Sequence, residues 1–244
     1  MLSKSQISYV RSLHQKKFRQ MYGKFVVEGD KLVQELLNSD IKTDTVYCIK
    51  GYAPQPSHVE VIEVSETELE KISTQQTPDK VLAVANIPAQ AAVPPKLEEG
   101  LYLLLDNLND PGNCGSIIRI ADWFGIKEVF LSDTSVDVYN PKVVAAAKGS
   151  LFRLRCTYTG LPELITQNNH LAAYGTFMSG ENIYQTSLPS SAMIVIGNEA
   201  NGISNEMEVL IKNRITIPAF GKAESLNAAV ATGIVVSEFK RRKA

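Results

Sequence analysis

The spacing of apolar residues in the first third of the chain predicts a small α/β domain. Short apolar or alternating runs predict strands, whereas apolar residues at i, i+3 and i+4 predict helices. The expected strands are residues 25–27, 46–49, 59–64 and 81–86. Residues 3 to about 19 are expected to form a helix and a basic turn, and residues 30–38 and 67–72 are expected to form helices. Ser3 and Gln6 have the spacing of a capping box at the start of the first helix.

Apolar strands alternate with helical stretches through the rest of the sequence. The expected strands are residues 102–105, 128–131, 152–156, 172–177, 193–196 and 214–217. The expected helices are residues 115–124, 141–149, 161–168, 205–211 and 226–241. Because continuous apolar strands are buried on both faces, this pattern predicts an α/β domain with a mostly parallel sheet between two layers of helices.

A Pro/Ala-rich stretch separates these two parts. Residues 87–95 (IPAQAAVPP) carry no charge and contain three prolines, a composition typical of a linker. We therefore expect one domain over residues 1–95 and a second over residues 96–244.

Composition narrows the function classes. The apolar and charged fractions, 44% and 21%, are those of an ordinary globular protein, and no apolar run approaches the roughly 20 residues of a membrane-spanning helix. Cys48, Cys114 and Cys156 are widely separated, which argues against a disulfide framework and against a structural zinc site. We expect a cytoplasmic protein with no metal and no membrane segment.

The net charge of −1 hides a basic N-terminal segment. Residues 1–24 contain no acidic residue, and aromatic side chains are interleaved with the cations. Such a segment can contact RNA phosphates and stack on bases. The candidate phosphate contacts are Arg11, Lys16, Lys17 and Arg19. The alternative interpretation is a solvated helix face.

Three segments rich in Gly and Asn follow expected strands. They are residues 106–119 (DNLNDPGNCGSIIR), 197–204 (GNEANGIS) and 218–227 (PAFGKAESLN). Because the carboxyl ends of parallel strands meet at one edge of a sheet, the segments can converge on one small polar ligand, with Arg119 as a cation. Alternatively they are tight turns with helix caps, in which Asn113 caps a helix near Gly115. The usual dinucleotide, P-loop, zinc-protease and serine-hydrolase signatures are absent from the sequence.

At these segments the chain resembles the SpoU (TrmH) family of RNA ribose 2′-O-methyltransferases, within the SPOUT class. The three family motifs correspond to DPGNCGSIIRIADWFG, IGNEANGIS and IPAFGKAESLNAAVA, in the family's order. The N-terminal phrases KFVVEGDKLVQELL and TPDKVLAVANIP are similar to the family's small L30e-like substrate-binding domain. The resemblance implies a trefoil-knotted C-terminal domain, S-adenosylmethionine as methyl donor, and a homodimer formed through the C-terminal domain.

The resemblance also implies residue roles. The positions that would hold the donor are Gly197, Asn198, Ile217, Leu226 and Thr176. The positions of the catalytic site are Arg119, Asn113, Ser225, Asn227 and Glu199.

The chain departs from the family's usual pattern at a few positions. Ala145 and Ala147 stand where Arg and Ser are common, and Asp30 and Lys80 also differ, which bears on RNA contacts more than on donor binding. The appended small domain favours ribosomal RNA, of the 23S type, as the substrate. Methylation of tRNA and a non-catalytic RNA-binding or assembly role are the alternatives.

Overall fold

The computed structural model describes residues 1–52, 59–89 and 96–241. The chain forms two compact units, Met1–Ala89 with Asp137–Arg153, and Gln90–Val136 with Leu154–Ala244. Most of the expected linker, residues 90–95, lies outside the described residues. No described helix has the length and apolar character needed to cross a membrane.

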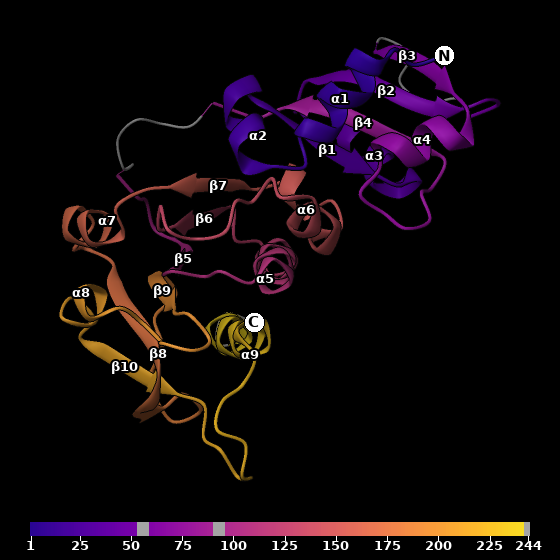
Figure 1. Cartoon of the computed structure of the whole chain (residues 1–244). Helices are drawn as coiled ribbons and strands as arrows, with labels where there is room; N and C mark the ends of the chain where they lie inside the picture. The colour runs from indigo at the N-terminus through magenta and orange to yellow at the C-terminus, as the bar shows by residue number, and fades with distance from the viewer. Residues whose placement is uncertain (53–58, 90–95, 242–244) are drawn as a thin grey trace. The chain divides into compact units, whose positions relative to one another are not determined.

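The first unit contains a four-stranded sheet in the order β1-β4-β2-β3 (Figure 1). Its strands are β1 (Lys24–Glu28), β2 (Thr43–Ile49), β3 (Glu60–Val64) and β4 (Val81–Asn86). β4 lies antiparallel to both β1 and β2, whereas β3 runs parallel to β2. Because β4 is central, its run of apolar residues is buried.

The N-terminal part of this unit contributes the helices α1 (Lys4–Ser12), α2 (Lys16–Tyr22), α3 (Asp30–Leu37) and α4 (Glu66–Ile72). The Ser3–Gln6 capping box begins α1 as predicted. The helix and basic turn expected over residues 3 to about 19 form two helices, because Gln15 is extended (φ −102°, ψ 134°) and precedes the second. Gly23, with φ +61°, ends α2 in the left-handed conformation that glycine adopts without strain.

The segment Asp137–Arg153 belongs to the first unit although it is distant in sequence. It contains α6 (Pro141–Ala147) and a short 3-10 turn, η1 (Ser150–Phe152). The Arg19 side chain, 2% exposed, donates to the Asp137 carboxylate with Nη2 and Oδ2 2.6 Å apart. The Phe25 and Tyr139 rings lie 4.7 Å apart between centroids, and Arg153 pairs with Glu35.

We predict that replacing Asp137 by alanine destabilises the first unit by about 3–5 kcal/mol, because it leaves the buried Arg19 guanidinium without its counter-charge. Urea denaturation measures the change. Glu35→Ala is the matched control, since its partner Arg153 is about half exposed, and such pairs contribute at most about 1 kcal/mol. Equal losses in the two variants would contradict a special role for the buried pair.

The second unit is built on a six-stranded sheet in the order β10-β8-β9-β5-β6-β7. The strands are β5 (Leu101–Leu105), β6 (Glu128–Leu131), β7 (Arg155–Tyr158), β8 (Ala172–Asn182), β9 (Ala192–Ile196) and β10 (Asn213–Thr216). Every pairing among them is parallel, which confirms the predicted sheet. The strand expected at residues 152–156 is displaced, because η1 occupies its first residue.

Helices cover both faces of the parallel sheet (Figure 1). On one face α5 (Pro111–Trp123) packs against α9 (Ala228–Arg241). On the other face lie α7 (Leu161–Gln167) and α8 (Asn205–Glu208). Alternate strand residues face the two layers, so Leu104, Met193 and Val195 pack with α7 and α8 in one buried cluster.

Candidate active site at the carboxyl ends of the parallel strands

The three Gly/Asn-rich segments follow β5, β9 and β10, and hydrogen bonds join them at one edge of the sheet. The Asn113 amide donates to the Glu199 carboxylate, which links the first segment to the second. The Asn227 amide donates to Asn113 Oδ1 at 2.7 Å, which links the third segment to the first. The predicted convergence of these segments is therefore observed.

Helix α5 begins earlier than the sequence pattern indicated. Asp110 is its N-cap and accepts the Asn113 backbone N–H at 2.7 Å, while Pro111 occupies the first turn, where a missing N–H costs nothing. The interpretation of Asn113 as the cap is therefore wrong. Because Asp110 satisfies its backbone, Asn113 can direct its side chain to the other two segments.

Asn113 and Asn227 use both ends of their side-chain amides. Asn227 Oδ1 accepts the backbone N–H groups of Ala229 (2.9 Å) and Val230 (3.2 Å) at the start of α9, and its Nδ2 donates to Asn113. Asn113 Nδ2 then donates to Glu199. The two amides fix the relative positions of the segments.

Arg119 differs from these residues because its side chain makes no hydrogen bond or ion pair with the described residues. It lies farther along α5 and its side chain is exposed. An arginine on a helix that is anchored by Asn113 presents a fixed positive charge to an incoming anion. Ser225 is also exposed, in the third segment.

The second segment is a closed loop with no space for a side chain at its first residue. The backbone of Asn198 exchanges hydrogen bonds with Gly202, at 2.9 and 2.8 Å, and Asn198 Oδ1 accepts the N–H groups of Ala200 and Asn201. A Cβ atom added to Gly197 would lie 2.3 Å from the Gly202 carbonyl carbon. The loop therefore presents backbone rather than side chains at this point.

The remaining predicted donor-binding residues lie on β8 and at the two ends of the third segment. Ile217 is half-buried, Leu226 is exposed, and Thr176 donates its hydroxyl to the Val195 carbonyl oxygen at 3.3 Å. A bare backbone at Gly197 and accessible apolar surface at Ile217 and Leu226 fit a ligand with a flat apolar ring and polar edges, such as the adenosine of S-adenosylmethionine.

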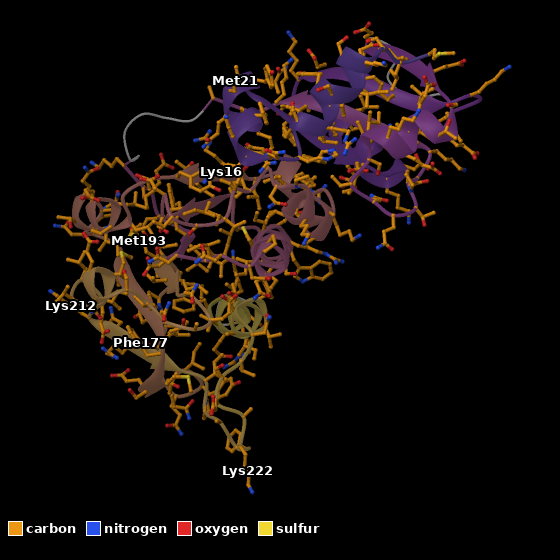
Figure 2. All side chains as sticks on the ribbon, in the orientation of Figure 1. Lys16, Met21, Phe177, Met193, Lys212 and Lys222 are labelled. Atoms are coloured by element: carbon orange, nitrogen blue, oxygen red, sulfur yellow. The ribbon has the colours of Figure 1, made fainter. Side chains whose placement is uncertain are left out.

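The predicted RNA-binding cations have two different environments in the first unit. Arg11, Lys16 and Lys17 are exposed (Figure 2 labels Lys16), and the Lys17 ammonium lies 5.5 Å from the Phe18 ring centroid. Arg19 is instead buried, where it donates to Asp137 and to the Leu13 carbonyl oxygen at 2.9 Å. The prediction that Arg19 contacts phosphate is therefore wrong, because its donors are used inside the unit.

The cysteines have no exposed thiol. All three are buried, and burial raises the pKa of the Cys48 and Cys156 thiols. A raised pKa keeps a thiol protonated and weakly nucleophilic. Cys114 thus contributes packing to α5 although it lies within the first motif.

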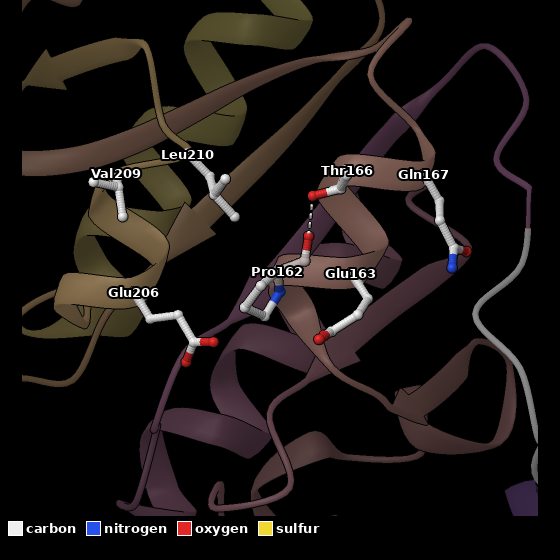
Figure 3. A pocket seen from close by; sticks show the side chains of 7 residues that line it. All are labelled: Pro162, Glu163, Thr166, Gln167, Glu206, Val209 and Leu210. Atoms are coloured by element: carbon white, nitrogen blue, oxygen red, sulfur yellow. Dashed lines mark hydrogen bonds between the residues drawn. The ribbon is translucent and has the colours of Figure 1, made fainter.

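A separate hollow of about 450 Å³ lies between α7 and α8 (Figure 3). Its lining residues are Pro162, Glu163, Thr166, Gln167, Glu206, Val209 and Leu210. None of them belongs to the three segments. The geometry of the strand-end edge, rather than the size of this hollow, identifies the candidate site.

Comparison with known families gives matches for both parts of the chain. Residues 100–237 match the SpoU rRNA Methylase family. Residues 4–83 match the MRM3-like substrate binding domain.

Individual relatives match over most of the chain. The 23S rRNA (guanosine(2553)-2′-O)-methyltransferase RlmP of Bacillus subtilis is 30% identical, over 93% of this chain and 92% of its own length. A TrmH-family protein from Porphyromonas gingivalis has a solved structure that is 41% identical, covers 99% of both chains and superposes with a TM-score of 0.90. The SpoU methyltransferase AviRb of Streptomyces viridochromogenes, solved in complex with AdoMet, is 26% identical, covers 99% of this chain and 98% of its own, and gives a TM-score of 0.89.

Proposed function

This chain belongs to the SpoU rRNA methylase family, and from that premise we propose that it methylates a ribose 2′-hydroxyl of ribosomal RNA with S-adenosylmethionine as donor. The observation that carries the proposal is the convergence of the three strand-end segments through Glu199, Asn227 and Asn113, which lies on the helix that also carries Arg119. The closed backbone loop at Gly197 can accept a nucleoside-containing donor. The exposed Arg119 side chain, which makes no ion pair with the described residues, can bind an anionic acceptor.

The sulfonium of S-adenosylmethionine supplies an activated methyl group for in-line displacement by the ribose oxygen. We propose that Gly197, Ile217 and Leu226 hold the donor through backbone groups, with Asn198 and Thr176 supporting the loop and the neighbouring strand. Asn113 and Asn227 keep the segments in register, and Glu199 anchors the second segment to α5. Ser225 is the exposed hydroxyl available to orient the acceptor nucleoside.

Arg119 is proposed to bind the phosphate beside the target ribose and to stabilise the negative charge that develops on its 2′-oxygen. Direct base catalysis by Arg119 would require loss of its proton, which is costly because the pKa of arginine lies above about 12. A fixed cation lowers the barrier without changing its own protonation state. The proton of the hydroxyl then passes to water.

Two measurements test the proposed activity. Calorimetry is expected to show binding of S-adenosylmethionine to the purified protein. Maps of 2′-O-methylation in RNA from cells with and without the protein are expected to differ at a ribosomal position. A difference confined to tRNA would show that the substrate is tRNA rather than ribosomal RNA. RNA binding by the protein with no methyl group lost from cellular RNA would indicate a non-catalytic RNA-binding or assembly factor.

We further propose that residues 1–95 form the RNA-binding domain and residues 96–244 the knotted methyltransferase domain, with Asp137–Arg153 packed into the first unit. Arg11, Lys16 and Lys17 are exposed cations in this domain, whose family is described as substrate-binding. The relatives named as bacterial 23S rRNA methyltransferases support a cytoplasmic location.

The double substitution Lys16→Glu with Lys17→Glu should weaken RNA binding and reduce the slope of log K against log salt by about 1–2, because each phosphate contact releases counterions. Filter binding over a range of salt concentrations measures both quantities. The charge-matched control is Lys127→Glu with Lys212→Glu; these exposed residues precede β6 and β10, at the amino ends of the parallel strands. If the two double variants weaken RNA binding equally, the effect comes from net charge and not from contacts of Lys16 and Lys17 with phosphates.

The proposed homodimer uses α5 and α9, which pack against each other and still expose apolar surface. Trp123 is 84% exposed and Val230 53% exposed. Val230→Glu is therefore expected to shift the protein from dimer to monomer in light scattering, since it places a charge on apolar surface that would be buried. Val209→Glu, at an 81% exposed position directly after α8, is the control. A wild-type monomer at micromolar concentration would refute the dimer.

A further inference from the structure

A pair of residues outside all of the predicted site positions connects the strand-end loops. Asp106 and Asn107 directly follow β5, and Asp106 is 3% exposed. A buried carboxylate is costly unless hydrogen bonds compensate for lost hydration. The bonds that Asp106 and Asn107 make therefore identify what this pair holds in place.

Asp106 fixes the far end of the second segment. Its Oδ2 accepts the Ser204 backbone N–H at 2.7 Å, and its Oδ1 accepts the Asn107 side-chain amide at 2.9 Å. The Asp106 backbone N–H also donates to the carbonyl oxygen of Ile196, the last residue of β9, at 2.9 Å.

Asn107 fixes the near end of the same segment. Its backbone adopts φ +54°, and in this conformation its carbonyl oxygen accepts the Asn198 side-chain amide at 2.9 Å. Asn tolerates the left-handed region better than most residues with a side chain. The Asn107 backbone N–H donates to Ser132 Oγ at 2.9 Å, and its Oδ1 accepts the Thr134 hydroxyl.

The second segment is thus clamped at both ends by two adjacent residues of the first. Internal bonds between Asn198 and Gly202 fix the shape of the loop, but those bonds do not fix where the loop lies relative to β5. Asp106 and Asn107 supply that position, and the loop between their contacts carries Glu199 and follows directly on Gly197.

We propose that Asp106, aligned by Asn107, is a positioning residue for donor binding, an inference that rests on the proposed function. It acts by accepting hydrogen bonds rather than by its charge. We expect substitution of Asp106 to change the affinity for S-adenosylmethionine and not the affinity for RNA, because Asp106 and Asn107 bind Ser204 and Asn198 of the proposed donor-binding loop.

Asp106→Ala should weaken S-adenosylmethionine binding about 10- to 100-fold, the factor that corresponds to loss of a hydrogen bond to a charged group. Calorimetry at a temperature well below unfolding measures the affinity. Kinetics should show a raised KM for the donor with the KM for RNA unchanged.

Asp106→Asn should retain donor affinity close to that of the wild type. The new amide oxygen still accepts the Ser204 N–H, and the Asn107 amide can rotate so that its oxygen faces the new NH2 group. The Asn107 side-chain nitrogen then donates to the Thr134 hydroxyl, which can accept as well as donate. Retained donor affinity in this variant would show that the side chain at position 106 acts as a hydrogen-bond acceptor and not through its negative charge.

Glu128→Ala is the matched control for lost stability. Glu128 is a half-buried carboxylate of β6 in the same sheet that accepts the Thr157 hydroxyl and pairs with Arg155. Its position at the start of β6 is at the opposite end of the strands from the three segments. It should leave donor affinity unchanged. The inference is overturned if Asp106→Ala binds the donor like the wild type, if Asp106→Asn binds as poorly as Asp106→Ala, or if Glu128→Ala weakens binding equally. A wild-type protein that fails to bind the donor would instead refute the proposed function, and this inference with it.

Discussion

Replacing Arg119 by alanine should lower kcat for methyl transfer about 100- to 1,000-fold, the range for removal of one fixed group that stabilises transition-state charge. The Arg119 side chain is exposed and makes no ion pair or hydrogen bond with the described residues, so its loss should leave the fold intact. The dissociation constant for S-adenosylmethionine should remain unchanged, because the donor is assigned to the second and third segments.

Single-turnover assays and calorimetry on the same preparation separate these two quantities. Arg155→Ala provides the matched control, since Arg155 is a 75% exposed arginine of the same unit that lies on β7 and pairs with Glu128. Near-normal turnover by the Arg119 variant would exclude its assigned role. A parallel loss of donor binding would move Arg119 into the donor site instead.

Replacing Gly197 by alanine should reduce donor affinity by about 100-fold or more, comparable to the cost of displacing a binding group by about 1 Å. The added Cβ would lie 2.3 Å from the Gly202 carbonyl carbon and 2.4 Å from the Ile203 backbone nitrogen. Because these are backbone atoms of the same closed loop, no rotation of a side chain can relieve the clash. The loop must shift away from the end of β9.

Gly100→Ala is the matched control, directly before β5 and outside the three segments. A Cβ added there would lie 3.6 Å from the nearest atoms, those of the Tyr102 side chain, which is an ordinary van der Waals contact, and the backbone does not need a left-handed conformation. Its donor affinity should stay within about twofold of the wild type, as for most surface substitutions. Calorimetry measures the affinity of each variant for S-adenosylmethionine, and thermal unfolding shows whether each variant is folded. Equal affinities for the two variants would show that the loop at Gly197 does not contact the donor.

The periodicity of the sequence predicted the parallel sheet because its strands are buried on both faces. β5 and β9 are short apolar runs, and the position of each polar segment after such a run predicted where the site would form. The family resemblance then supplied the donor and the reaction, which no hydrophobic pattern encodes.

The errors arose where a local cap or a distant partner determines the structure. α5 starts at Pro111 because Asp110 caps it, although the glycine-rich sequence after Pro111 has low helix propensity. The burial of Arg19 depends on Asp137, whose proximity cannot be inferred from nearby residues. The sequence pattern does not reveal the roles of Asp106 and Asn107, although Asn107, the second residue after β5, is of a type that favours a left-handed turn.

The Arg19–Asp137 pair imposes an order on events during synthesis of the chain. Arg19 leaves the ribosome 118 residues before its partner, a delay of roughly 6–24 s at translation rates of about 5–20 residues per second. Until then the guanidinium has no counter-charge, so it must remain hydrated and the N-terminal sheet cannot reach its final packing. The nascent first unit therefore completes folding only after translation has passed Asp137, within the methyltransferase sequence.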